Sequence, residues 1–107
     1  MSLSITSAVG ENHILISLEG DVDTKTAPEL LAALTAHDLA NATQLRLDIK
    51  GVNFMSSAGL RVLVFSKQKM SHDATVYVIG ANQEITDVIT KTGLSTAVSM
   101  VASVDDI

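Results

Sequence analysis

The chain has 107 residues, no cysteine, 7 Lys and Arg against 12 Asp and Glu, and a formal net charge of −5. Its 47% of hydrophobic residues are enough for a buried core and too many for a disordered chain. The acidic balance argues against nucleic acid or an anionic membrane surface as the main partner. The lack of cysteine excludes a disulfide framework, a thiol nucleophile and a cysteine-ligated zinc site. We therefore expect one domain that spans residues 1–107.

The start of the chain contains no basic stretch followed by an apolar run, so no signal peptide is predicted. No apolar stretch approaches the roughly 18 to 20 residues that a membrane-spanning helix needs. We expect a cytoplasmic protein without a membrane partner.

Two strands are predicted at the start of the chain, because apolar and polar residues alternate over residues 3–8 and 13–19. Residues 10–12 have turn character, so these strands are expected to form a hairpin. The alternation breaks at residues 20–24.

A first helix is expected to begin near Pro28, whose missing N–H is not needed in a first turn. Thr26 is the expected N-cap, and Glu29 adds a favourable charge to the first turn. Apolar residues then recur with helical spacing at positions 27, 30, 31 and 34.

The middle of the chain predicts a strand over residues 44–49, after which Gly51 and Asn53 are expected to open a loop. A second helix is expected from residue 56 to about residue 70. This segment is apolar on much of its circumference, which predicts heavy burial.

The end of the chain predicts a β-branched strand over residues 75–79 and a third helix around residues 85–89. Gly93 is a suitable C-terminal stop for that helix, and a last short strand is expected within residues 94–101. Strands that alternate with helices predict an α/β fold: a mostly parallel, mixed sheet with an N-terminal hairpin and helices in β-α repeats.

Function in such sheets is usually found where strands end and helices begin, which points to residues 20–26, 51–57 and 80–82. Asp21 and Asp23 fit either a carboxylate pair or a polar turn before a helix. Asp48 fits either a cation ligand or a loop cap.

Common catalytic motifs are missing from the sequence. Neither G-x-x-x-x-G-K-[ST] nor G-x-G-x-x-G is present. The three histidines, at positions 13, 37 and 72, have no metal-ligand spacing, so no metal site is predicted. Ser57 and Gly59 form half of a nucleophile elbow, but no His–acid pair accompanies them. We therefore expect neither an enzyme nor a bound cofactor.

The two serines at the start of the second helix are the most informative feature. A serine at this position can act as an N-cap. It can also be a phosphorylation site, because a phosphate at a helix N-terminus faces unpaired N–H groups and the positive end of the helix dipole. The added charge of about −1.5 to −2 would repel a partner that packs there, while the fold persists.

The segment Phe54–Leu63, FMSSAGLRVL, resembles the signature of the STAS domain, and in particular of bacterial anti-sigma factor antagonists. Residues 20–30 resemble the family pattern G-x-x-D-x-x-x-A-x-x-L, which leads into the first helix. Residues 76–94 are similar to the strand, the helix and the Gly-Leu turn that close the domain. The resemblance covers essentially the whole chain in the right order and spacing.

This resemblance implies that Ser57 is the phosphoacceptor, because the family carries it directly before the second helix. The family often has Asp before this serine and a second Ser after it, where this chain has Ser56 and Ala58. Ser56 is therefore a rival acceptor, although the register of Gly59 favours Ser57. The resemblance also implies contacts with the partner at Asp23, Thr26, Met55, Ser56, Gly59, Leu60 and Arg61.

The resemblance further implies a partner-switching cycle. The unmodified protein binds an anti-sigma factor that is also a Ser/Thr kinase, and so frees the sigma factor. The kinase uses its own ATP and Mg²⁺ to phosphorylate the serine and is released, and a Ser phosphatase restores binding.

Two other functions remain open from the sequence. The second interpretation is a constitutive STAS scaffold of a larger signalling or lipid-transport assembly, with Ser57 only a helix cap. An enzyme or nucleotide-binding domain of the same fold is the third interpretation, and no activating base or phosphate loop supports it.

Overall fold

The computed structural model describes residues 3–107, so the first two residues of the expected 1–107 domain lie outside the described part. Strands and helices follow one another much as the alternation of the sequence predicts. The elements are β1 (Leu3–Val9), β2 (His13–Val22), α1 (Ala27–Thr35), η1 (Leu39–Asn41), β3 (Gln44–Met55), α2 (Ser57–Lys69), β4 (Thr75–Ile79), α3 (Gln83–Lys91), η2 (Leu94–Thr96), β5 (Ser99–Val101) and η3 (Val104–Asp106).

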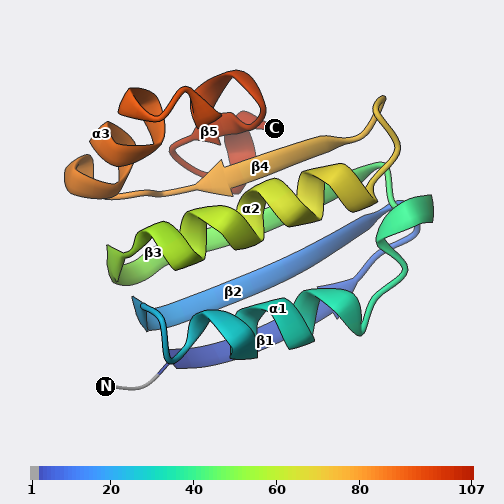
Figure 1. Cartoon of the computed structure of the whole chain (residues 1–107). Helices are drawn as coiled ribbons and strands as arrows, with labels where there is room; N and C mark the ends of the chain where they lie inside the picture. Colours follow the sequence, from blue (N-terminus) through green and yellow to red (C-terminus); the bar gives the residue numbers. More distant parts are fainter. Residues whose placement is uncertain (1–2) are drawn as a thin grey trace.

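The five strands form one mixed sheet in the order β1-β2-β3-β4-β5. The β1–β2 hairpin is antiparallel, and every other neighbouring pair is parallel. The predicted α/β fold is therefore confirmed, including its N-terminal hairpin. In Figure 1, α1 and α2 run side by side across one face of this sheet, and α3 lies near the end that carries β4 and β5.

The core is aliphatic and lies between the sheet and the helices. Alternate residues of β2 and β3 point into it, because successive side chains of a strand point to opposite faces. The helices contribute a buried stripe each. Core residues with almost no exposed surface include Ile16, Leu18, Leu30, Leu34, Leu45, Leu47, Ile49, Leu63, Val76 and Ile89.

Strands β2 and β3 are longer than the sequence predicts. The loop expected after residue 49 is wrong, because β3 continues through Gly51 and Asn53 to Met55. The break expected after residue 19 is also wrong, since β2 continues to Val22. Strands β2 and β3 stay paired with each other as far as Val22 and Met55, with two register shifts along the way.

Helix α2 is less buried than its composition suggests. Only the side that faces the sheet is covered, and Val64 on the opposite side is 39% exposed. Gly93 follows the C-cap of α3 and stops the helix, as predicted. Its φ of 79° is left-handed, a conformation that glycine adopts without a Cβ penalty. Among the helices of residues 3–107, none is both long enough and apolar enough to cross a lipid bilayer.

Candidate functional site

The carboxyl ends of β2 and β3 lie next to each other and bring two of the predicted loops together. Val22 pairs with Met55 in the sheet register. Directly after this pair, the backbone N–H of Ser56 donates a 2.8 Å hydrogen bond to the carbonyl oxygen of Val22. The β2–α1 turn and the start of α2 are therefore held side by side by the main chain.

The third predicted loop, around Asn82, reaches the same edge of the sheet. The Asn82 side-chain amide donates to the carbonyl oxygen of Asn53 at 3.2 Å, and its Oδ1 accepts the N–H of Ile85 at 2.8 Å. Asn82 is thus the N-cap of α3, and it also ties α3 to the end of β3.

The two adjacent serines differ sharply in accessibility. Ser57 is the first residue of α2 and is exposed. Ser56 is the N-cap residue, with extended backbone at φ −82° and ψ 174°, but its side chain makes no cap hydrogen bond. Its Oγ is buried without a partner among the described residues. Of the two serines, Ser57 is therefore the more accessible residue.

The N-terminus of α2 is electrostatically receptive to an anion. The helix has neither a side-chain cap nor an acidic residue in its first turn. Its first intrahelical hydrogen bond runs from the Leu60 N–H to the Ser56 carbonyl oxygen, at 3.2 Å. The N–H groups before Leu60 therefore precede the helical ladder, at the positive end of the dipole.

The turn that leads into α1 is built by Asp23 and Thr26. The Asp23 Oδ1 accepts backbone N–H bonds from Lys25 at 2.9 Å and from Thr26 at 3.0 Å. The Thr26 hydroxyl donates to the Asp21 carbonyl oxygen at 2.7 Å and accepts the Asp23 N–H at 2.9 Å. The polar-turn interpretation of Asp21 and Asp23 therefore fits this geometry.

Thr26 occupies the N-cap position of α1 as expected, but its side chain makes no cap bond and is buried. Its hydroxyl is fully used in the turn. The N–H of Thr26, as the largest cause, holds the pKa of Asp23 below its ordinary value, and desolvation partly opposes this shift.

Close packing fixes α2 against the sheet at Gly59. A Cβ on Gly59 would lie 2.7 Å from side-chain carbons of both Val22 and Met55. Met55 and Leu60 are themselves buried, so these side chains support the surface from beneath. Arg61 is exposed on α2, one helical turn beyond Ser57.

Asp48 lies within β3 and not at its end. Its Oδ1 accepts the Lys50 N–H at 3.1 Å, and its Oδ2 lies 3.6 Å from the Lys50 Nζ. Local bonds within the strand therefore use both oxygens.

An apolar groove between α1 and α2 was missed by the sequence analysis. It measures about 400 Å³ and begins beside Ser57, and we call it the α1–α2 groove. Its lining is Thr24, Ala27, Pro28, Leu31, Ala58, Arg61, Val62 and Phe65. The i, i+3, i+4, i+7 spacing of each set of lining residues is visible in the sequence. The sequence does not show that the two sets face each other.

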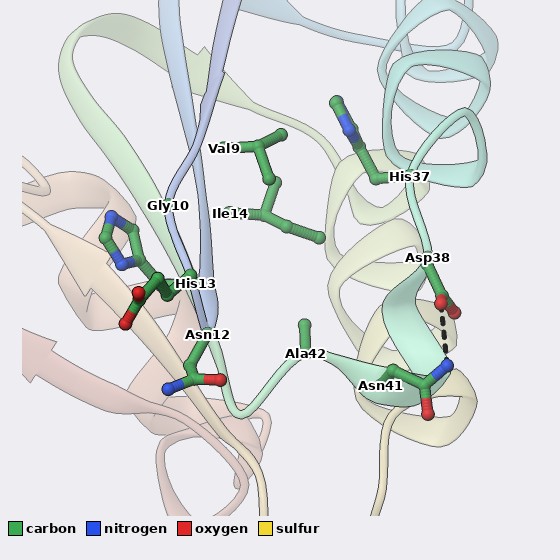
Figure 2. Close-up of a pocket in the computed structure, with 10 residues that line it drawn as sticks. Val9, Gly10, Asn12, His13, Ile14, His37, Asp38, Asn41 and Ala42 are labelled. Carbon is green, nitrogen blue, oxygen red and sulfur yellow. Dashed lines mark hydrogen bonds between the residues drawn. The ribbon is translucent and has the colours of Figure 1, made fainter.

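A smaller hollow of about 180 Å³ lies at the opposite end of the sheet, beside the β1–β2 turn. Figure 2 shows Val9 and Ile14 projecting toward the segment that carries His37 and Asp38, and the 2.7 Å bond from Asn41 to Asp38. This hollow shares no lining residue with the α1–α2 groove.

Known proteins resemble the chain over most of its length. The STAS domain model matches residues 4–107. The anti-sigma-B factor antagonist of Listeria monocytogenes is 31% identical over 85 residues, which are 78% of this chain and 75% of the relative. The anti-sigma-B factor antagonist of Staphylococcus aureus is 25% identical over 95 residues, 88% of each chain.

The structural comparison agrees. A crystal structure of an anti-sigma factor antagonist from Mycobacterium paratuberculosis matches with a TM-score of 0.88 at 25% identity, covering 98% of this chain and 90% of that chain. The chain therefore belongs to the STAS domain family, and it is similar to anti-sigma factor antagonists in sequence and in fold.

Proposed function

We propose that this chain is an anti-sigma factor antagonist that switches partners through phosphorylation of Ser57. It binds an anti-sigma factor with Ser/Thr kinase activity while Ser57 is unmodified, and it releases that protein when Ser57 is phosphorylated. The observation that carries the proposal is the exposed position of Ser57 at the start of α2, beside a Ser56 hydroxyl that is buried. The names of the relatives support the choice of partner.

The chemistry belongs to the partner proteins. In the forward step the Ser57 Oγ attacks the γ-phosphorus of ATP, the hydroxyl proton passes to a base of the kinase, and ADP leaves. In the reverse step a Ser phosphatase hydrolyses the phosphate ester with water, which returns the hydroxyl and releases inorganic phosphate. ATP and Mg²⁺ are bound by the kinase, in the cytoplasm where we place this cycle.

Phosphorylation at this position suits a switch that leaves the fold intact. The N-terminus of α2 stabilises an anion, because its first-turn N–H groups and the helix dipole face it. The phosphate adds about −1.5 to −2 charges to a surface that the partner must desolvate. The same group is thus tolerated by the domain and repelled at the interface.

The scaffold alternative assigns Ser57 only a capping role. The N-cap residue of α2 is Ser56, and its side chain makes no cap bond. Capping therefore gives no reason for a hydroxyl at residue 57, which favours the switch.

The test is capture of the partner from host cells with the wild-type chain and with Ser57→Asp, followed by identification of bound proteins by mass spectrometry. We expect wild type to retain an anti-sigma factor kinase and Ser57→Asp to lose it, with melting temperatures that differ by no more than a few degrees.

Phosphate transfer is then measured with the purified kinase and ATP. Wild type and Ser56→Ala should each gain one phosphate, and Ser57→Ala should gain none. Equal binding of the kinase by wild type and Ser57→Asp would contradict the switch.

A further inference from the structure

The α1–α2 groove has the shape of a seat for a third helix. One wall is formed by residue 24, in the turn before α1, and by residues 27, 28 and 31 of α1, and the other wall by residues 58, 61, 62 and 65 of α2. Each set has the i, i+3, i+4, i+7 spacing of one helical stripe. Two parallel stripes on neighbouring helices leave a trough into which the ridge of another helix packs.

The floor of the trough is apolar and only partly covered. Leu31 and Phe65, which line the groove, are half-buried. Contiguous apolar surface of this kind, rimmed by polar residues, is typical of an interaction site. Covering it would remove apolar area from water, which favours association.

The α2 side of the trough is basic, although the chain as a whole is acidic. Helix α2 contains Arg61, Lys67 and Lys69 and no Asp or Glu. Arg61 lines the groove, and the Lys69 Nζ lies 5.2 Å from the centroid of the Phe65 ring. Within residues 3–107 neither Arg61 nor Lys69 is part of an ion pair.

Lys67 differs from the other two cations of α2. Its Nζ donates a hydrogen bond to the Ala74 carbonyl oxygen and so is directed toward the end of the helix. The cations available to an occupant of the groove are therefore Arg61 and Lys69. Their eight-residue separation corresponds to about 12 Å along the helix.

The helices of a second copy are poor occupants. Helix α3, the most acidic of them, already buries Ile85 and Ile89 in the core. Two copies joined groove to groove would bring Arg61 and Lys69 of one copy close to those of the other, which is repulsive.

We propose that the α1–α2 groove binds an amphipathic helix of the anti-sigma factor partner. This helix presents one apolar stripe to Leu31 and Phe65 and carries carboxylates about two turns apart, opposite Arg61 and Lys69. The inference rests on the proposed function and adds the partner element and the residues that recognise it.

The same arrangement gives a route by which phosphate releases the partner. Ser57 and Arg61 are four residues apart on α2, so they lie on the same face of the helix. A phosphate on Ser57 pairs with Arg61 and so competes with the carboxylate of the partner for that cation. It also repels the carboxylate directly.

The experiment measures affinity for the purified anti-sigma factor kinase by calorimetry with Lys69→Glu and with Lys91→Glu as the matched control. Both lysines lie in the last turn of an α-helix, so both changes have the same unfavourable effect on a helix dipole. We expect Lys69→Glu to weaken binding at least tenfold and Lys91→Glu to change it less than twofold. A Lys substitution at the matching acidic residue of the partner should restore binding to Lys69→Glu.

Phe65→Ala, checked first for folding by thermal unfolding, should also weaken binding at least tenfold. If Lys69→Glu and Phe65→Ala bind like wild type while Ser57→Asp still releases the kinase, the groove proposal is wrong and the switch stands. If wild type binds no anti-sigma factor, the proposed function itself fails. A dimer of the chain alone that dissociates in Lys69→Glu would identify a second copy as the occupant and overturn the proposal.

Discussion

The backbone N–H of Ser56 donates a 2.8 Å hydrogen bond to the carbonyl oxygen of Val22, directly beyond the last paired residues of β2 and β3. This bond joins the start of α2 to the end of β2. It places Ser57 at the junction of two strands and a helix rather than on a long loop.

Gly59→Ala should destabilise the protein although alanine is the better helix former. Helix propensity alone favours alanine by about 1 kcal/mol. The new Cβ would lie 2.7 Å from carbons of Val22 and Met55, and overpacking of this kind costs about 1 to 3 kcal/mol. We expect urea unfolding to show a net loss of stability. A variant more stable than wild type would show that α2 does not pack this closely.

Thr26→Val should lower the free energy of unfolding by about 1 to 3 kcal/mol, because it leaves the Asp21 carbonyl oxygen and the Asp23 N–H without their buried partner. Thr24→Val is the control, since Thr24 is exposed and makes no comparable bond. Chemical denaturation of both variants measures the two losses of unfolding free energy. Equal losses would contradict the assigned role of the Thr26 hydroxyl.

The N-cap residues Asn82 and Ser56 should respond differently to substitution by alanine. Asn82→Ala removes a real cap bond to Ile85 and should cost about 1 kcal/mol. Ser56→Ala removes a buried hydroxyl that has no partner within residues 3–107, so its effect should stay within about 0.5 kcal/mol or be slightly stabilising. Thermal unfolding of the two variants tests this, and a larger loss for Ser56→Ala would reverse the assignment.

The stability conferred by Asp23 should depend on pH in the acid range. Its pKa in the folded protein lies below 3.8, chiefly because the Thr26 N–H favours the ionised carboxylate. The lowered folded pKa means that this stability is complete above pH 3.8 and is lost as the pH falls through the folded pKa.

Asp23→Asn should accordingly be less stable than wild type near neutral pH, and the difference should shrink at acid pH. Carboxyl NMR titration gives the folded pKa directly. A value above 3.8 would rule out this account of the turn.

The alternation of short segments was enough to predict the order of strands and helices. It failed where pairing between distant residues decides the outcome. Gly51 and Asn53 are weak strand formers, but β3 continues because β2 pairs with Gly51 and, after a register shift at Asn53, with Phe54. That long-range pairing has no local signal in either segment.

The candidate site also has features that the sequence predicted and features that it did not. The order of strands and helices predicted which loops matter, and the structure brings those loops to one edge of the sheet. It did not show that Thr26, Met55 and Leu60 are buried, because side-chain direction depends on how α1 and α2 pack. Whether these residues contribute to partner contact stays a prediction.

The main-chain hydrogen bonds of Ser56, the residue directly before Ser57, also bear on timing. Phosphorylation at such a fixed position needs no slow refolding step before the partner is released. Dephosphorylation then restores the original surface. In the proposed cycle, the response time of the circuit would then be set by the turnover of two opposing enzymes and by how fast the released protein diffuses away.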